Sequence, residues 1–148
     1  MIRKATVDDV DELYLIETIC FRERRFQREH ILWILHHPNA ATYIDRNERT
    51  RGTLMLLLEG AVCRVLSLAV HPAYRRQGIG RALMALSEDY AVAHGATIVK
   101  LEVSTKNAVA IDFYKSLGYE NTGFLSNYYS WGEDAHSMSK NVALRAKT

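Results

Sequence analysis

The sequence predicts a single α/β (α+β) domain, in which a mixed, mostly antiparallel sheet of about seven strands is flanked by about four helices. Segments with strand and helix periodicity follow one another in the order β-α-α-β-β-β-α-β-α-β-β. Three successive strand-like runs in the first half are separated by polar turns, which indicates antiparallel hairpins. A strand, a glycine-containing turn and a helix come next, so one crossover connection is expected in the sheet.

Length and composition fit one domain that covers residues 1–148. Hydrophobic residues make up 48% of the chain and charged residues 24%, so a sizeable core can be buried. The formal net charge of +2 is too small to indicate nucleic-acid binding by itself. The basic residues are clustered at 22–28, 46–51 and 75–81, so local patches are more informative than the total charge.

The first predicted elements are a strand and two helices. The strand covers 2–6, and an N-cap at Thr6 or Asp8 begins a helix over 7–21. The second helix covers 28–37 and ends before a proline, because the residue before proline avoids the α region.

Three strands then form a predicted meander. They cover 41–45, 53–59 and 61–70, with a polar turn over 46–52 and a tight turn at Gly60. Both faces of the third strand are largely apolar, which predicts a central strand covered on both sides.

The second half alternates helices and strands. A helix follows the glycine-containing turn and ends at Gly95, and Asn107 begins a further helix that ends at Gly118. The strands predicted in this half cover 97–104, 119–125 and 135–142.

The turn Arg75–Arg81, with the sequence RRQGIGR, has the composition of an anion-binding site. The first amides of the following helix have no partner within the helix and carry the positive end of its dipole. Gly78 and Gly80 leave room for an anion near these amides, and three arginines add positive charge. The spacing differs from the dinucleotide and P-loop motifs, so a nucleoside triphosphate is disfavoured. The alternative is a glycine turn with solvated arginines.

Two later residues have the chemistry of a base and an acid. Alternation along strand 97–104 places Glu102 opposite the apolar face. In a cleft this carboxylate suits a general base for an amine, whereas at an exposed edge it is only solvated. Tyr114 shares a helix face with Asn107, and it is either a core aromatic or a proton donor near a cleft.

The remaining features narrow the choice of chemistry. Tyr128 and Tyr129 fall between the last two strands, where they either pack or grip a peptide backbone. Cys20 and Cys63 lie in apolar runs with no histidine at metal-ligand spacing, so we expect buried thiols and no metal site. The first residues have no apolar signal stretch, and no apolar run is long enough to span a bilayer, which favours the cytoplasm.

Taken together, these residues resemble the GNAT N-acetyltransferase superfamily. The segment LSLAVHPAYRRQGIGRAL resembles its acetyl-CoA motif, Q/R-x-x-G-x-G/A with the preceding strand. The segment LEVSTKNAVAIDFYKSLGY, followed by NYY and EDAHSM, resembles the branch that acetylates protein N-termini, in particular ribosomal-protein-alanine N-acetyltransferases of the RimI type. One departure is that Arg22 follows Phe21, where this branch usually has proline in the loop that shapes the acceptor pocket.

The resemblance implies an acetyl-CoA-dependent enzyme that acts on the N-terminal amine of a protein, with a ribosomal protein as one candidate, and without a metal, a nucleic acid or a membrane. It implies that Glu102 takes the proton of the acceptor ammonium through water and that Tyr114 protonates the departing thiolate. The implied acceptor contacts are Phe21, Tyr128 and Tyr129. The implied acetyl-CoA contacts are Leu68, Ala69, Val70, Arg75, Arg76, Gln77, Gly78, Ile79, Gly80, Arg81 and Asn107.

Two other functions fit parts of the same pattern. An acetyltransferase for a lysine side chain or a small amine would have an open, acidic pocket in place of two tyrosines. A non-catalytic acyl-CoA-binding module would keep the turn at 75–81 but would not need Glu102 or Tyr114.

Overall fold

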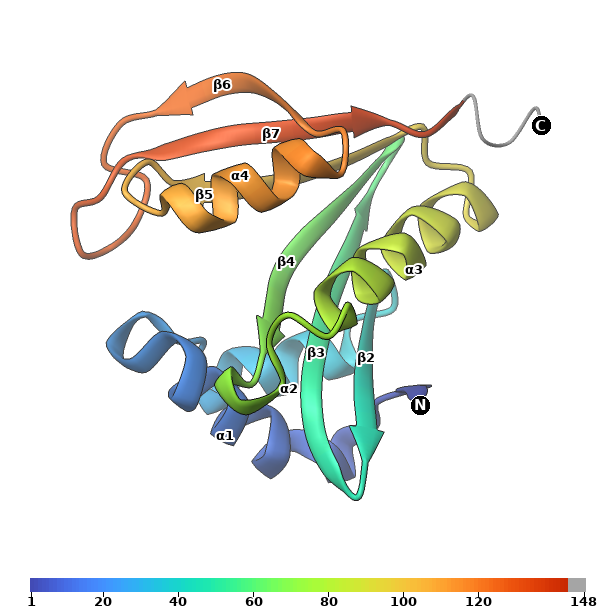
Figure 1. Cartoon of the computed structure of the whole chain (residues 1–148). Helices are drawn as coiled ribbons and strands as arrows, with labels where there is room; N and C mark the ends of the chain where they lie inside the picture. The colour runs from blue at the N-terminus through green and yellow to red at the C-terminus, as the bar shows by residue number, and fades with distance from the viewer. Residues whose placement is uncertain (144–148) are drawn as a thin grey trace.

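The computed structural model of the protein describes residues 1–143 and confirms the predicted mixed sheet with helices on both faces (Figure 1). Seven strands lie in the order β1-β2-β3-β4-β5-β7-β6, and only the β4–β5 pair is parallel. No helix in this part of the chain is long and apolar enough to cross a membrane. The strands are β1 (Ile2–Lys4), β2 (Ala40–Asn47), β3 (Arg49–Glu59), β4 (Val62–Val70), β5 (Ile98–Ser104), β6 (Glu120–Leu125) and β7 (Ala135–Asn141). The α-helices are α1 (Val10–Phe21), α2 (Arg28–His36), α3 (Ile79–Ala93) and α4 (Ala108–Ser116).

The sheet separates two apolar cores. Leu83 of α3 and Leu101 of β5 are buried in the core that α3 and α4 cover. Leu13 of α1 and Ile31 of α2 are buried in the core on the opposite face. Alternate residues of the central strands face the two cores, as the apolar pattern of 61–70 predicts.

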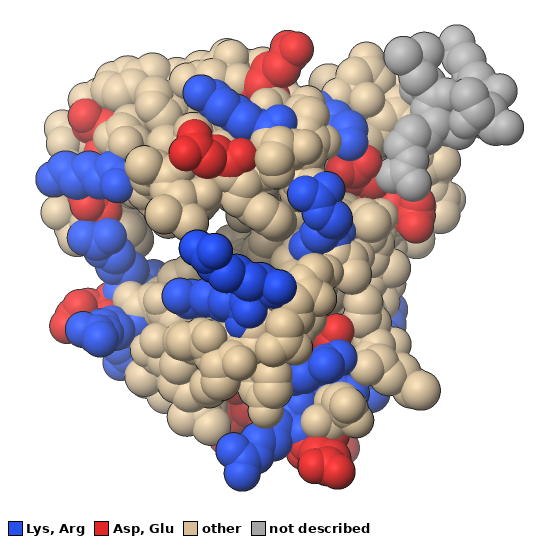
Figure 2. Space-filling model, viewed as in Figure 1, with Lys and Arg blue, Asp and Glu red and all other residues tan. Residues whose placement is uncertain are grey.

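The parallel strands β4 and β5 meet at one end and then diverge (Figure 1). They pair only over 62–64 and 98–100. A β-bulge at Leu66 follows directly, since Met55 of β3 is opposite Ser67 while the next residue of β3 is opposite Val65. A bulge bends its strand, so beyond it β4 no longer pairs with β5, and the molecular surface is hollowed between the two halves of the sheet (Figure 2).

The polar segment 46–52 differs from its prediction as a turn. Glu48 alone separates β2 from β3, with a φ of 66°, and the rest of the segment is strand. An ion pair of 2.6 Å between Arg51 and Asp45 joins the two strands, and this pairing explains why so polar a segment stays extended. A second difference is that the helix predicted over 7–21 begins as a 3₁₀ turn, with α1 starting at Val10.

Candidate active site

The end of β4 presents backbone groups to the opening beside β5. The His71 N–H donates to the carbonyl of Arg51 in β3 at 2.8 Å. Hydrogen bonds alternate along an antiparallel pair, so the backbone groups of Ala69 also point to β3, whereas those of Leu68 and Val70 point into the opening. Of the three residues predicted to hold the cofactor through their backbone, the geometry therefore favours Leu68 and Val70.

The Val70 carbonyl already accepts two hydrogen bonds. The Cys20 thiol donates to it at 3.4 Å, and Arg75 Nε donates at 3.1 Å. Burial raises the pKa of Cys20, although the Arg75 guanidinium opposes this shift, so the thiol is a neutral donor. Cys20 is only half-buried, unlike Cys63, which is fully buried as predicted.

The first turn of α3 leaves backbone amides free beside open space. Arg76 and Gly78 have left-handed φ angles of 64° and 82°. The first hydrogen bond of the helix runs from the Ala82 N–H to the Gly78 carbonyl at 3.0 Å, so the amides of 79–81 have no partner within the helix. A Cβ atom at Gly78 would meet nothing within 4 Å. Lys and Arg side chains gather over this end of α3, beside a hollow (Figure 2), so the surroundings suit an anion.

Glu102 is enclosed, and its two carboxylate oxygens have different surroundings. Its side chain is only 7% exposed, which excludes the solvated edge position. Arg64 forms an ion pair with Oε1, and the Tyr128 hydroxyl donates to the same oxygen at 3.3 Å. Oε2 is buried and has no hydrogen-bond partner among the described residues. Oε2 is therefore the oxygen that can accept a proton from a substrate or water.

Sequence reasoning missed Arg64, which also pairs with Glu59 at 2.6 Å. A single charge inside the apolar run VCRVLSL is a signal, because a partly buried charge requires a partner. The identity of that partner depends on the parallel register that places Arg64 beside Lys100 and close to Glu102. This register is not readable from the sequence.

Tyr129 links the predicted base to the predicted acid. Its ring lies against that of Tyr128 at 5.0 Å and stacks on Trp131 at 4.6 Å. Burial, Tyr128 and the charge of Glu102 raise the pKa of Tyr129 to about 12. Burial, and then Tyr129, raise the pKa of Tyr114 far above its ordinary value. The tyrosine wall (Tyr128 and Tyr129) therefore contacts Glu102 through the Tyr128 hydroxyl, and Tyr129 contributes to the raised pKa of Tyr114.

Sequence reasoning did not single out a buried carboxylate in α1 that hydrogen-bonds both to β4 and to the chain after α1. Glu17 of α1 is 1% exposed and accepts hydrogen bonds from the Ser67 hydroxyl at 2.6 Å and the Phe26 N–H at 3.0 Å. Burial raises the pKa of Glu17, and these two bonds oppose the shift. Glu17 therefore fastens the α1–α2 connection (22–27) to the bulge of β4.

The other two predicted residues lie at the ends of helices. Phe21 is the last residue of α1, and Arg22 after it has a φ of 53°, which turns the chain into the α1–α2 connection. Asn107 Oδ1 accepts a hydrogen bond from the Ala110 N–H at 3.1 Å and so caps α4 as predicted. The Asn107 side chain is exposed, so it can also reach a ligand.

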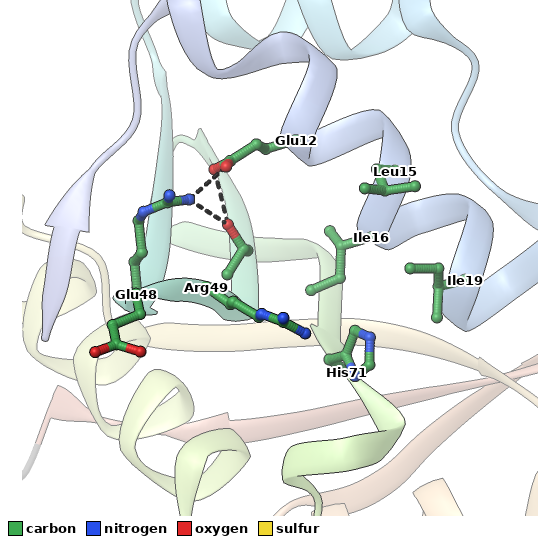
Figure 3. Close-up of a pocket in the computed structure, with 9 residues that line it drawn as sticks. Glu12, Leu15, Ile16, Ile19, Glu48, Arg49 and His71 are labelled. Carbon is green, nitrogen blue, oxygen red and sulfur yellow. Dashed lines mark hydrogen bonds and ion pairs between the residues drawn. The ribbon is translucent and has the colours of Figure 1, made fainter.

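A separate cavity of about 290 Å³ lies between α1 and the β2–β3 hairpin (Figure 3). Glu12 forms an ion pair with Arg46 inside it and accepts a hydrogen bond from Thr50 at 2.8 Å. None of the predicted site residues lines it. Its lining residues are Glu12, Leu15, Ile16, Ile19, Arg46, Glu48, Arg49, Thr50 and His71. The cavity is therefore distinct from the Glu102 site.

Comparison with known proteins gives a consistent result. The model of the Acetyltransferase (GNAT) family matches residues 7–119. An N-alpha-acetyltransferase of Sulfurisphaera tokodaii is 43% identical, over 93% of this chain and 90% of that protein. NAA10, the catalytic subunit of the N-terminal acetyltransferase A complex of Arabidopsis thaliana, is 31% identical over 95% of this chain and 77% of that protein. The crystal structure of the ribosomal-protein-S18-alanine N-acetyltransferase of Escherichia coli has a TM-score of 0.86 at 26% identity, and the match covers 96% of this chain and 93% of that one.

Proposed function

The chain belongs to the GNAT family of acetyl-CoA-dependent N-acetyltransferases, and from this membership we propose that it acetylates the N-terminal amine of a protein. The observation that carries the proposal is the enclosed carboxylate of Glu102. Tyr128 donates to one of its oxygens, and the other oxygen has no partner in the part of the chain that the structure describes. Relatives named for N-terminal acetylation support it, and one of them makes a ribosomal protein a candidate acceptor. In this proposal residues 1–148 form one catalytic domain. The enzyme acts in the cytoplasm, where Cys20 and Cys63 remain thiols.

The binding step uses the opening beside β4. The pantetheine arm of acetyl-CoA lies along Leu68 and Val70 as an added strand would, and the free amides at the start of α3 hold the pyrophosphate. Arg76 and Arg81 add positive charge near the phosphates. The acceptor enters on the side of the tyrosine wall, so its amine and the thioester meet beside Glu102.

The chemical step is a direct attack that needs no enzyme nucleophile. Glu102 Oε2 takes a proton from the acceptor ammonium, through water, and leaves a neutral amine. The amine nitrogen forms a bond to the thioester carbonyl carbon, and the carbon–sulfur bond then breaks. Tyr114, which its raised pKa keeps protonated, gives its proton to the departing thiolate. The nitrogen loses its second proton as it becomes the amide, and this proton restores the Tyr114 phenol through water. The proton on Glu102 returns to solvent.

Charge at the site disfavours acetylation of a lysine or a small polyamine. Such an acceptor calls for an open, acidic pocket, whereas the two enclosed carboxylates near the wall, Glu102 and Glu133, are both paired with arginines. Because Arg64 offsets the charge of Glu102, this carboxylate does not attract cationic acceptors from a distance.

The test is acetyl-CoA turnover, followed by thiol release, on three acceptors. They are a peptide panel varied at its first residue, the same peptides with a blocked N-terminus and an internal lysine, and spermidine. We expect turnover on free N-termini only. Equal or faster turnover on the blocked peptides or on spermidine would replace the proposal with the corresponding alternative, and acetyl-CoA binding without any turnover would indicate a binding module.

A further inference from the structure

We propose that Arg24 is a positioning residue for acetyl transfer, because it joins the α1–α2 connection to the β6–β7 connection (126–134) and so holds the tyrosine wall at Glu102. Arg24, Trp131 and Glu133 form this loop bridge. The proposal rests on the proposed function of the Glu102 site, and it adds a residue outside β4 and α3 to the groups on which the acceptor depends.

The centre of the loop bridge is a two-pronged ion pair. Arg24 Nη1 lies 3.0 Å from Glu133 Oε1, and Nη2 donates to Oε2 at 3.1 Å. The two residues are 109 positions apart in the chain, so the pair joins segments with no local connection. The Glu133 side chain is only 8% exposed, whereas that of Arg24 is 52% exposed, so the pair is enclosed on the Glu133 side. The two-pronged geometry fixes orientation as well as distance.

Glu133 is held from two further sides. Trp131 Nε1 donates to its Oε1 at 2.6 Å, and the Ser104 hydroxyl donates to the same oxygen at 3.3 Å. The hydrogen bond from Trp131 and the charge of Arg24 keep the pKa of Glu133 below its usual value, although burial opposes them. Ser104 is the last residue of β5, the strand that carries Glu102, so the loop bridge is fastened to the catalytic strand.

Ring contacts connect the loop bridge to the predicted base. The Arg24 guanidinium lies 5.4 Å from the ring centroid of Trp131. Trp131 stacks on Tyr129 with 11° between the rings, Tyr129 contacts Tyr128, and the Tyr128 hydroxyl donates to Glu102. A change in the position of Arg24 is therefore transmitted to the side chains that face the acceptor.

The β6–β7 connection needs this outside support. It contains two left-handed residues, Asn127 and Gly132, and Tyr128 and Trp131 remain 46% and 41% exposed. Arg24 lies in the α1–α2 connection and contacts Trp131 and Glu133 of the β6–β7 connection. Without Arg24 we expect the tyrosine wall to occupy more positions and the acceptor to be held less often in the reactive geometry.

The test compares Arg24→Gln and Arg24→Lys with a matched control, Arg28→Gln. Arg28 also pairs with a carboxylate, Asp11, on the surface, but it does not touch the tyrosine wall. For Arg24→Gln we expect kcat/KM for the peptide to fall by about tenfold, with unchanged acetyl-CoA affinity and a melting temperature like that of the control. Arg24→Lys keeps the charge but loses the fork, so an intermediate value is expected.

A second readout separates this proposal from the proposed function. Hydrogen exchange of residues 126–134 should quicken in Arg24→Gln and stay unchanged in Arg28→Gln, whether or not any peptide is turned over. Unchanged exchange in Arg24→Gln overturns the loop bridge. Faster exchange with wild-type peptide kinetics, or an equal loss of acetyl-CoA binding, overturns the positioning role. A wild-type enzyme that turns over no peptide rejects the proposed function and leaves the exchange result to decide on the bridge.

Discussion

Glu102 differs from an ordinary strand carboxylate because its two oxygens have different surroundings. Arg64 and Tyr128 hold Oε1, and Oε2 is enclosed without a partner among the described residues. An unpaired buried oxygen is costly, so a bound water or an acceptor ammonium at Oε2 would relieve that cost. At the residue scale, Oε2 is therefore the atom at which a water or the acceptor amine can bind.

Replacement of Glu102 by glutamine tests whether this carboxylate accepts the proton of the acceptor. The amide keeps the size of the side chain but cannot take the proton, so kcat/KM should fall by about 10²–10⁴-fold while acetyl-CoA still binds. The readout is thiol release with a peptide acceptor. Glu59→Gln is the matched control, because Glu59 is the other partner of Arg64 and faces no substrate in this account. A loss of similar size in the control would show that Arg64, and not the proton acceptor, limits the reaction.

The raised pKa of Tyr114 leads to a prediction about the pH dependence of kcat. Burial favours the neutral phenol, so the proton-donating form should persist as the pH rises through 10, the ordinary tyrosine value. We expect kcat to stay level between pH 8 and pH 10 and to fall by about 10²-fold in Tyr114→Phe. A decline of the wild-type kcat in this range that is absent from Tyr114→Phe would contradict the raised pKa, and a wild-type kcat in Tyr114→Phe would contradict the role as acid.

At the element scale, the packing of α3 on β3 fixes where the free amides of α3 stand. Gly52 of β3 lies directly beneath the first turn of α3. A Cβ atom at position 52 would be 2.8 Å from Ile79 Cγ2 and 3.2 Å from the carbonyl oxygen of Ala69. The Ile79 side chain and the backbone of β4 cannot move freely at this contact. Any residue larger than glycine at position 52 therefore requires a shift of α3 or of β4.

Gly52→Ala should therefore affect the cofactor end of the site. We expect a stability loss of about 1–3 kcal/mol, measured by denaturant unfolding, together with a raised KM for acetyl-CoA. Gly123→Ala in β6 is the control, because its Cβ would meet only Ser137 Cβ at 3.4 Å and its φ is not left-handed. Wild-type stability and KM in Gly52→Ala would mean that α3 can move without consequence for acetyl-CoA.

The sequence is sufficient for most elements because each carries its own signal. Apolar periodicity, the Asn107 cap and the left-handed Gly118 define α4, for example. The hairpin between β2 and β3 was predicted, but its short turn at Glu48 was not, because the extended arms depend on the pairing of Arg51 with Asp45 after folding. The bulge at Leu66 likewise depends on the register with β3.

At the scale of the whole molecule, the site lies where the sheet divides. β4 and β5 are paired over three residues and then separate, so groups from both halves face one opening. The local motifs at 75–81 and Glu102 indicated the two substrates. Arg64 and the loop bridge were missed, because Arg64–Glu102 and Arg24–Glu133 join residues 38 and 109 positions apart. Only the folded chain brings such partners together.

The most direct test of the central claim is the position of the transferred acetyl group. A peptide with a free N-terminus and an internal lysine would be incubated with acetyl-CoA and the wild-type enzyme, and the product sequenced by tandem mass spectrometry, with Glu102→Gln in parallel. The account predicts acetylation of the N-terminal nitrogen alone, strongly reduced in the variant. Acetyl on the lysine, or N-terminal acetylation at the wild-type rate in Glu102→Gln, would contradict it.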